Sequence, residues 1–368
     1  MSRLMFLALR DLRRGWRRFV LVGSVVGLVA VLSTVLSGLA DGLVRDGTSG
    51  LRALPLTHLA FAPHSEAVFS RSTLDERALS AWTAQPGVQA SPIGVSFVNG
   101  APVGGRRGEP SIDLALFGVR DGDFLAAADA QRARDLEGLV LAGELRDEGV
   151  RIGDRYRIAG SDVVLPVLGF TFAGSYGHVP IAYTSLAAWR RIAYGNDARG
   201  RFSALALRLP PGLDATKLAA RAGTELKTKE QAFAGSPGFT AETATMSLIR
   251  AFLLAISALV VGAFFTVLTV QRTQQIGVMK ALGASTAYVV RDGVAQMLVV
   301  VAVATVAGGA AGTAIVALLD GGPVPVALVP GGIAASAGLL VAAGLAGSLV
   351  ALRRIARVEP AIALGVQA

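Results

Sequence analysis

An acid, a thioether and a guanidinium follow one another at helical spacing in the stretch 240–250. Glu242, Met246 and Arg250 are each four residues apart, so a helix that begins here would place them on one face. The uncharged run 251–270 follows directly, which puts the three side chains near a membrane surface. Polar groups at that depth mark binding or transport sites by default. In the alternative interpretation, Glu242 stabilises the amino end of the helix and Arg250 extends its charged end to water.

The familiar signatures of catalysis and nucleotide binding do not occur elsewhere in the sequence. The chain has no cysteine, which excludes disulfides, thiolate metal sites and thiol nucleophiles. His58, His64 and His178 have spacings that match no metal-ligand pattern, and we expect each to be a surface or packed side chain. Neither G-x-x-x-x-G-K-[S/T] nor G-x-S-x-G is present. We therefore expect no catalytic residue, no bound metal and no P-loop, so the chain is not an enzyme by this interpretation.

The elements that must position these residues are membrane spans. Of the 368 residues 52% are apolar, which is too high for an ordinary soluble domain. Four runs, 19–40, 251–270, 293–319 and 331–352, approach the roughly 20 residues needed to cross a bilayer. The first run is longer than the apolar part of a signal peptide, so we expect it to be a retained span.

The net charge predicts which parts of the chain face the cytosol. Residues 1–18 carry six arginines and one aspartate, and segments 271–292 and 353–368 each carry a net +2, which together account for the formal charge of +9. The long segment between the first two spans is nearly neutral. By the positive-inside rule, both termini and the 271–292 loop are cytosolic and the long segment lies outside. The basic balance thus reflects topology, and no nucleic-acid partner is expected.

Small residues predict where the spans pack closely. The first span contains Gly23-x-x-x-Gly27, a spacing that lets two helices approach. The third span has Gly308, Gly309 and Gly312 in its middle. We therefore expect the third span to lie in the interior of the bundle.

The segment between the first two spans is long enough to form a folded domain. Helices are predicted over 72–82, where Asp75 and Glu76 follow Ser72 and Thr73 in a capping-box pattern, and over 214–226. Strands are predicted over 111–119, 138–142, 155–159, 163–170, 180–183 and 204–209. The predicted fold class is an α-helical membrane protein with four transmembrane helices and one extracytoplasmic mixed α+β domain between helices 1 and 2.

The loop between the second and third spans reads QRTQQIGVMKALGAS over residues 271–285. Ile276, Met279 and Leu282 fall on one side of a helix at this spacing, and the segment is basic. An amphipathic helix held at the cytosolic surface between two spans is suited to contact a partner.

This layout and this loop resemble the FtsX/MacB type of ABC transporter permease. The loop is similar to the family's most recognisable segment, and Leu9-Arg-Asp-Leu12 with the arginines after it is similar to the family's amino-terminal interface helix. The resemblance extends over essentially the whole chain. It implies that an ABC ATP-binding subunit binds ATP in a separate chain, and that this loop couples the two through residues that the family motif covers: Gln274, Ile276, Met279, Lys280, Leu282 and Gly283.

Within that family, two shorter segments resemble the haem-exporting permeases. They are Leu36-Ser-Gly-Leu-Ala-Asp-Gly-Leu43 and the run from Phe264 to Gln271. This narrower resemblance implies a homodimer that removes haem from the membrane, with a glutamate near the outer start of the second span involved in haem binding. Glu242 occupies that position here, and Met246 is added as a second haem-binding candidate on spacing.

The resulting prediction is a permease subunit of an ABC exporter in the cell (inner or plasma) membrane, with lipid around it and no intrinsic cofactor. The substrate would enter from the membrane between spans 1 and 2, close to Glu242. Two alternatives stay open: a signalling permease that acts on a cell-wall hydrolase or peptide without transport, and a lipoprotein or antibiotic exporter. The predicted segments are a cytosolic interface helix 1–18, transmembrane helix 1 at 19–44, the outer α+β domain 45–240, transmembrane helix 2 at 241–270, the coupling loop 271–292, transmembrane helix 3 at 293–319, an external turn 320–330, transmembrane helix 4 at 331–352 and a cytosolic tail 353–368.

Overall fold

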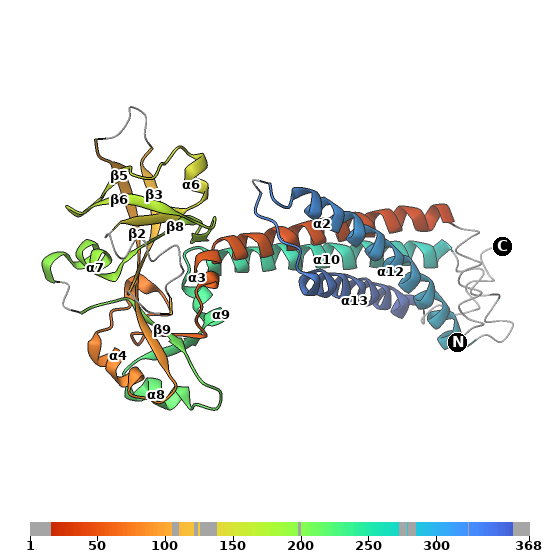
Figure 1. The fold of residues 1–368 in the computed structure, drawn as a ribbon. Helices are drawn as coiled ribbons and strands as arrows, with labels where there is room; N and C mark the ends of the chain where they lie inside the picture. Colours follow the sequence, from red (N-terminus) through yellow and green to blue (C-terminus); the bar gives the residue numbers. More distant parts are fainter. Residues whose placement is uncertain are drawn as a thin grey trace. The chain divides into compact units, whose positions relative to one another are not determined.

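The computed structural model describes residues 16–104, 110–120, 124–125, 138–197, 200–271, 278, 285–322 and 324–355. The chain divides into two compact units, of which one is Val44–Ala241 and the other joins the residues on either side of it, up to Leu43 and from Glu242. Figure 1 shows both units and labels most of their helices and strands.

Four long helices form the helical unit. They are α2 (Trp16–Asp46), α10 (Phe239–Gln271), α12 (Thr286–Leu319) and α13 (Pro330–Ile355). Each contains a stretch that is long and apolar enough to cross a membrane. The prediction of four apolar helices with the large insertion between the first and the second is therefore confirmed.

Glycine lets α2 and α12 pack backbone to backbone. A Cβ atom added to Gly308 would overlap the carbonyl oxygen of Gly27 and lie 2.8 Å from Cβ of Ala30. One turn further along, a Cβ on Gly312 would lie 2.7 Å from Cβ of Thr34. The small residues of the third span thus form a close helix contact, as the sequence predicted, and the partner helix is the first span.

A second close contact joins α10 to α13. A Cβ atom on Gly347 would overlap the carbonyl oxygen of Ala258, and one on Gly262 would lie 3.0 Å from the carbonyl oxygen of Gly347. The α2 and α13 helices are also joined by a hydrogen bond of 2.8 Å between the hydroxyls of Ser37 and Ser336. Close backbone packing and a half-buried polar pair join these helices, because the hydrophobic effect does not drive helices together in lipid.

The second unit is built on one mixed sheet. Its described strands run in the order β10, β1, β9, β2, β3, β8, β4, β6, β5, and β2 also pairs with β5. The β3–β8 and β4–β6 pairs are parallel and the others are antiparallel. The strands are β1 (His58–Phe61), β2 (Gln89–Pro102), β3 (Ile112–Val119), β4 (Leu139–Ala142), β5 (Arg155–Ile158), β6 (Val164–Thr171), β7 (Ser175–Tyr176), β8 (Val179–Ser185), β9 (Ala204–Arg208) and β10 (Glu225–Thr228).

Both faces of the middle of this sheet are covered, which explains the nearly continuous apolar runs in β3, β4 and β9. In β3, Leu114 and Leu116 enter one buried cluster while Ala115 and Phe117 enter the other. The first cluster is closed by α4 (Glu76–Thr83), α6 (Glu144–Asp147), α7 (Leu186–Tyr194) and α8 (Ala215–Arg221), and the second by α3 (Ser49–Ala53), α9 (Lys229–Ala232) and the short turns η1 (Phe69–Arg71) and η3 (Phe233–Gly235). A further turn, η2 (Gly195–Asp197), follows α7.

Two glycines opposite each other on β2 and β3 hold the indole of Trp189. Gly94 pairs with Gly118 across the strands, and a Cβ atom on either would overlap the Trp189 side chain. The Nε1–H of Trp189 donates to Oγ of Ser96 at 3.0 Å. The ring is 1% exposed, so it is both packed and hydrogen-bonded.

Two sequence predictions for this unit need correction. The predicted helix 214–226 ends at Arg221, because Gly223 turns the chain at a φ of 63° and the residues from Glu225 pair with β1 as strand β10. The helix predicted over 72–82 starts only at Glu76. Ser72 does not cap it, since its hydroxyl donates to the carbonyl oxygen of Ser203 instead.

Asp75 caps α4, and its removal is expected to weaken the α+β unit. Its Oδ1 accepts hydrogen bonds from the backbone N–H groups of Arg77 and Ala78 at 3.0 and 3.2 Å. Asp75→Ala should lower the free energy of unfolding by about 1 kcal/mol, whereas Asp75→Asn, which can still cap, should recover most of it. Urea unfolding followed by tryptophan fluorescence measures this, with Trp82 in the same helix as reporter. Equal losses in both variants would contradict the capping role.

Candidate functional site

The acid, the thioether and the guanidinium singled out in the sequence all lie in α10. The helix starts at Phe239 and runs without interruption past all three, so Glu242, Met246 and Arg250 share one stripe, as the spacing predicted. All three residues are partly buried. Glu242 belongs to the first turn, where its charge also favours the helix dipole.

The packing of α10 shows which way this stripe continues. Leu254, Ser257 and Val261 follow Arg250 at 4, 7 and 11 residues and lie against or within the interior of the helical unit. The opposite face is exposed along its length, with Leu248, Phe252, Leu259 and Val270 between 59% and 74% exposed. Arg250 is therefore at the outer end of the inward face of α10.

Two polar side chains on that inward face have buried atoms without a hydrogen bond. Nε and Nη2 of Arg250 are covered by protein and have no hydrogen-bond partner among the described residues. The hydroxyl of Ser257, seven residues further on, is in the same situation. Arg250 as a whole is half-buried, so these two atoms are covered while the rest of the side chain is partly exposed.

An apolar groove lies at the amino-terminal end of α2. It has a volume of about 460 Å³. Its lining comes from two helices: Phe19, Val20, Gly23 and Ser24 on α2, and Val299, Val300, Val303, Ala304 and Ala307 on α12. Glu242 and Met246 are not among these residues, so within the described chain this groove and the α10 stripe are separate features.

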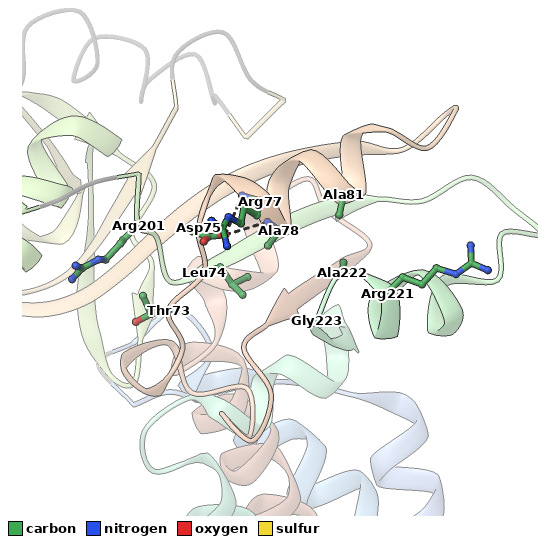
Figure 2. Close-up of a pocket in the computed structure, with 10 residues that line it drawn as sticks. All are labelled: Thr73, Leu74, Asp75, Arg77, Ala78, Ala81, Arg201, Arg221, Ala222 and Gly223. Carbon is green, nitrogen blue, oxygen red and sulfur yellow. Dashed lines mark hydrogen bonds between the residues drawn. The ribbon is translucent and has the colours of Figure 1, made fainter.

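The α+β unit has a pocket of about 460 Å³ that carries three arginines, Arg77, Arg201 and Arg221 (Figure 2). Figure 2 shows Arg201 and Arg221 extending in opposite directions, away from the middle of the pocket. Arg201 also donates to Asp197 at 3.2 Å. The three cations do not converge, so this pocket is not built to hold one anion.

His58 and His178 of this unit have different neighbours. Nδ1 of His58 is 3.0 Å from Oγ1 of the adjacent Thr57, and burial lowers the pKa of His58, with Glu230 opposing the shift. Nδ1 of His178 is 3.2 Å from Oδ2 of Asp46. Among the described residues, no group of three His, Asp or Glu side chains is placed to hold a metal ion.

Sequence reasoning missed a junction at the point where α2 enters the α+β unit and α10 leaves it. The carbonyl oxygen of Gly47, just after α2, accepts from Oγ of Ser236 at 3.0 Å and from the N–H of Gly177 at 2.8 Å. Ser236 lies just before α10. A single carbonyl thus ties together the two ends of the unit, which are 189 residues apart.

Further hydrogen bonds extend this junction. Oγ of Ser175, in β7, donates to the carbonyl oxygen of Asp46 at 2.5 Å, and its N–H donates to Oγ of Ser49 at 2.7 Å. Nζ of Lys229 donates to the carbonyl oxygens of Arg52 and Leu54, the latter at 2.7 Å. Burial lowers the pKa of Lys229. The small polar residues around the junction, such as those of Gly47-Thr-Ser49, are the only sequence signal that could have indicated it.

The predicted coupling residues, Gln274, Ile276, Met279, Lys280, Leu282 and Gly283, lie outside the described residues. Within the same loop, Val278 is described, as helical and 46% exposed. Ser285 then caps α12, its Oγ accepting from the N–H of Tyr288 at 3.2 Å. The coupling role of the six residues stays a prediction.

This chain is similar to known proteins, both in its carboxy-terminal part and over its full length. Residues 247–360 match the family model for the FtsX-like permease C-terminal domain. A protein of Staphylococcus haemolyticus named as the hemin transport system permease HrtB is 21% identical over 380 residues, covering 98% of this chain and 99% of that protein. The protein of the same name from Staphylococcus epidermidis is 21% identical over 305 residues and covers 80% of each chain.

An uncharacterized ABC transporter permease of Mycobacterium bovis is 23% identical over 374 residues, covering 98% of this chain and 99% of that protein. Among solved structures, the periplasmic region of MacB from Actinobacillus actinomycetemcomitans is 13% identical with a TM-score of 0.33, covering 49% of this chain and 92% of that one. The extracellular domain of the ABC-type transporter YknZ is 12% identical with a TM-score of 0.31, covering 47% and 98%.

The four apolar helices and the inserted α+β unit define a multi-pass membrane protein. The matched carboxy-terminal domain and the full-length relatives narrow the class of membrane protein. Residues 247–360 match an FtsX-like permease domain, and over its full length the chain is similar to proteins named as a hemin transport system permease and an ABC transporter permease.

Proposed function

We propose that this chain is the membrane subunit of an exporter that removes an apolar substrate from the membrane with energy from ATP hydrolysed by a separate subunit. The sequence contains no P-loop, so ATP must be bound elsewhere. The groove between α2 and α12 has an apolar lining, which supports an apolar substrate, and it is separate from the stripe that carries Glu242.

The proposal includes a topology and a homodimer. The arginines of residues 1–18 and the basic charge of segments 271–292 and 353–368 support cytosolic termini and an α+β unit outside the cell membrane. The exposed apolar face of α10 has to be covered by lipid or by a second copy. In this arrangement the 271–292 loops of both copies contact the ATP-binding subunits, whose closure moves the helices as rigid bodies.

Haem is the substrate we propose. The observation that carries this proposal is the stripe on α10, where Glu242 offers a carboxylate and Met246 a thioether one helical turn apart. Thioether sulfur is an established axial ligand of haem iron. The HrtB relatives, whose name refers to hemin transport, support the same substrate at low sequence identity.

Titration of the purified protein with haemin tests the substrate. Wild type is expected to shift the Soret band, and Glu242→Ala is expected to abolish the shift or weaken binding roughly tenfold or more, because an iron ligand is lost. Leu248→Ala, on the exposed face of the same helix, is the matched control and should bind as wild type does. Absence of any spectral change with wild type would remove haem and leave an exporter of another apolar substrate, such as a lipoprotein or antibiotic.

A second candidate function is mechanical signalling to a cell-wall hydrolase or peptide without transport. The junction at Gly47 favours it, because the residues that follow α2 and precede α10 in the sequence are hydrogen-bonded to each other within the α+β unit. Ser236→Ala removes one of these bonds. If the chain is a signalling protein, Ser236→Ala should reduce the response of the partner, and neither wild type nor the variant should export a substrate. If the chain is an exporter, wild type should show ATP-dependent efflux in vesicles.

A further inference from the structure

We propose that Arg250 binds the anionic group of an amphipathic ligand, a carboxylate or a phosphate, at the outer end of the inward face of α10. This inference deepens the proposed function, on which it rests: the chain would handle a substrate with an apolar body and an acidic group. The binding group is the edge of the guanidinium formed by Nε and Nη2.

The position of Arg250 on the helix provides the first part of the argument. Leu254 and Val261 share its face and belong to the interior cluster of the helical unit, in which Val261 is fully buried. Phe252 and Leu259, on the other face, are 62% and 74% exposed. A cation on the inward face is not directed at lipid, where its charge would be simply unfavourable.

The unpaired atoms provide the second part. Nε and Nη2 are the two donors on one edge of a guanidinium, and this edge forms two parallel hydrogen bonds to a carboxylate or phosphate. In Arg250 these two atoms are buried, and within the described chain neither has a hydrogen-bond partner. Burying hydrogen-bond donors of a charged group without acceptors is unfavourable, and an anionic ligand that accepts from Nε and Nη2 would remove this cost.

The distance to the proposed haem-binding residues is consistent with one ligand. Along a continuous helix, Arg250 is about 6 Å from Met246 and about 12 Å from Glu242, measured on the axis. Haem carries an iron atom at its centre and two carboxylates at its edge. Glu242 or Met246 would therefore meet the iron while Arg250 meets a carboxylate, and a lipid phosphate is the other source of the same chemistry.

Esterification of the ligand separates the anion from the rest of the molecule. Full-length protein in lipid nanodiscs is titrated with haemin and with haemin dimethyl ester, which lacks the negative charges. Wild type is expected to bind haemin roughly 10- to 100-fold more tightly than the ester, the range for a charged hydrogen bond, and Arg250→Gln should lose most of this preference. Arg221→Gln, an exposed arginine of the α+β unit, is the control and should keep it. An equal preference in wild type and Arg250→Gln would overturn the proposal.

A second measurement does not depend on haem, so failure of the haem proposal is distinguishable from failure of this one. The melting temperature of the detergent-purified protein is measured with laurate, with methyl laurate and with phosphatidylglycerol. Stabilisation of wild type but not Arg250→Gln by laurate alone assigns a carboxylate ligand, and by phosphatidylglycerol alone a lipid phosphate. If neither anion distinguishes the two proteins, Arg250 is not an anion site.

The ligand-free protein supplies a control for a merely structural role. Because two buried nitrogen atoms of Arg250 have no hydrogen-bond partner among the described residues, Arg250→Met is expected to raise the melting temperature of the ligand-free protein while it weakens anion binding. A structural arginine would give the opposite sign, a lower melting temperature, and that result would also overturn the proposal.

Discussion

Gly308→Val is expected to disrupt the helical unit. A Cβ atom at this position overlaps the carbonyl oxygen of Gly27, so α2 and α12 have to separate before the side chain fits. Overpacking typically costs about 1–3 kcal/mol, and a backbone atom cannot move aside as a side chain does, so we expect a loss at or above the top of that range. The yield of monodisperse protein in detergent and its melting temperature measure the effect.

Gly309 provides a matched control on the same helix. The nearest atom to an added Cβ there is Oγ1 of Thr34, at 4.0 Å, which is an ordinary contact. Gly309→Val should therefore be tolerated, with a melting temperature close to wild type. If both variants lose stability equally, the cause is the β-branched residue in the helix and not the contact with α2.

Met279→Asp is expected to separate ATP hydrolysis from transport. Met279 is predicted to lie with Ile276 and Leu282 on the apolar side of the coupling helix, and a carboxylate placed in an apolar contact costs several kcal/mol. Docking of the ATP-binding subunit should weaken by roughly 100-fold or more. The measurements are co-purification of the two subunits and ATP-dependent substrate movement in vesicles.

Ala281→Asp is the control for this experiment. Ala281 is two residues from Met279, which places it about 160° away around a helix. Ala281→Asp introduces the same charge into the same loop but on the other side of the helix, so coupling should be retained. Normal coupling in Met279→Asp, with the protein folded, would contradict docking through this side of the segment.

The long apolar helices were predictable from the sequence because each is defined by its own composition. Length and hydropathy suffice to identify them, and the glycines of α12 indicated a close contact before the partner helix was known. The sequence did not reveal that Gly27 would meet Gly308, since this depends on how two distant segments pack.

The strands of the sheet were harder to predict from the sequence, for physical reasons that β2 illustrates. This strand contains Pro92, Gly94 and Gly100, residues that normally indicate turns. Here Gly94 is required by the Trp189 ring packed on it, a tertiary contact that overrides local preference. The end of the predicted helix 214–226 was wrong for a similar reason, because pairing with β1 makes the residues from Glu225 a strand.

The candidate site was predictable in its spacing and unpredictable in its direction. Periodicity alone placed Glu242, Met246 and Arg250 on one face of a helix. Whether this face points to lipid, water or the interior depends on the helices around α10, and the interior packing of Leu254 and Val261 identifies it. The sequence also does not show that Nε and Nη2 of Arg250 are buried without a hydrogen-bond partner among the described residues, because this depends on the fold.

The junction at Gly47 also makes the α+β unit an exchangeable module. Because the chain enters and leaves this unit at residues joined by a direct hydrogen bond, Gly47 and Ser236 are held next to each other. An unrelated domain with adjacent termini, grafted between Gly47 and Ser236, would preserve that spacing. Such an arrangement allows the outer domain to diverge in sequence and size among permeases while the helices keep their packing.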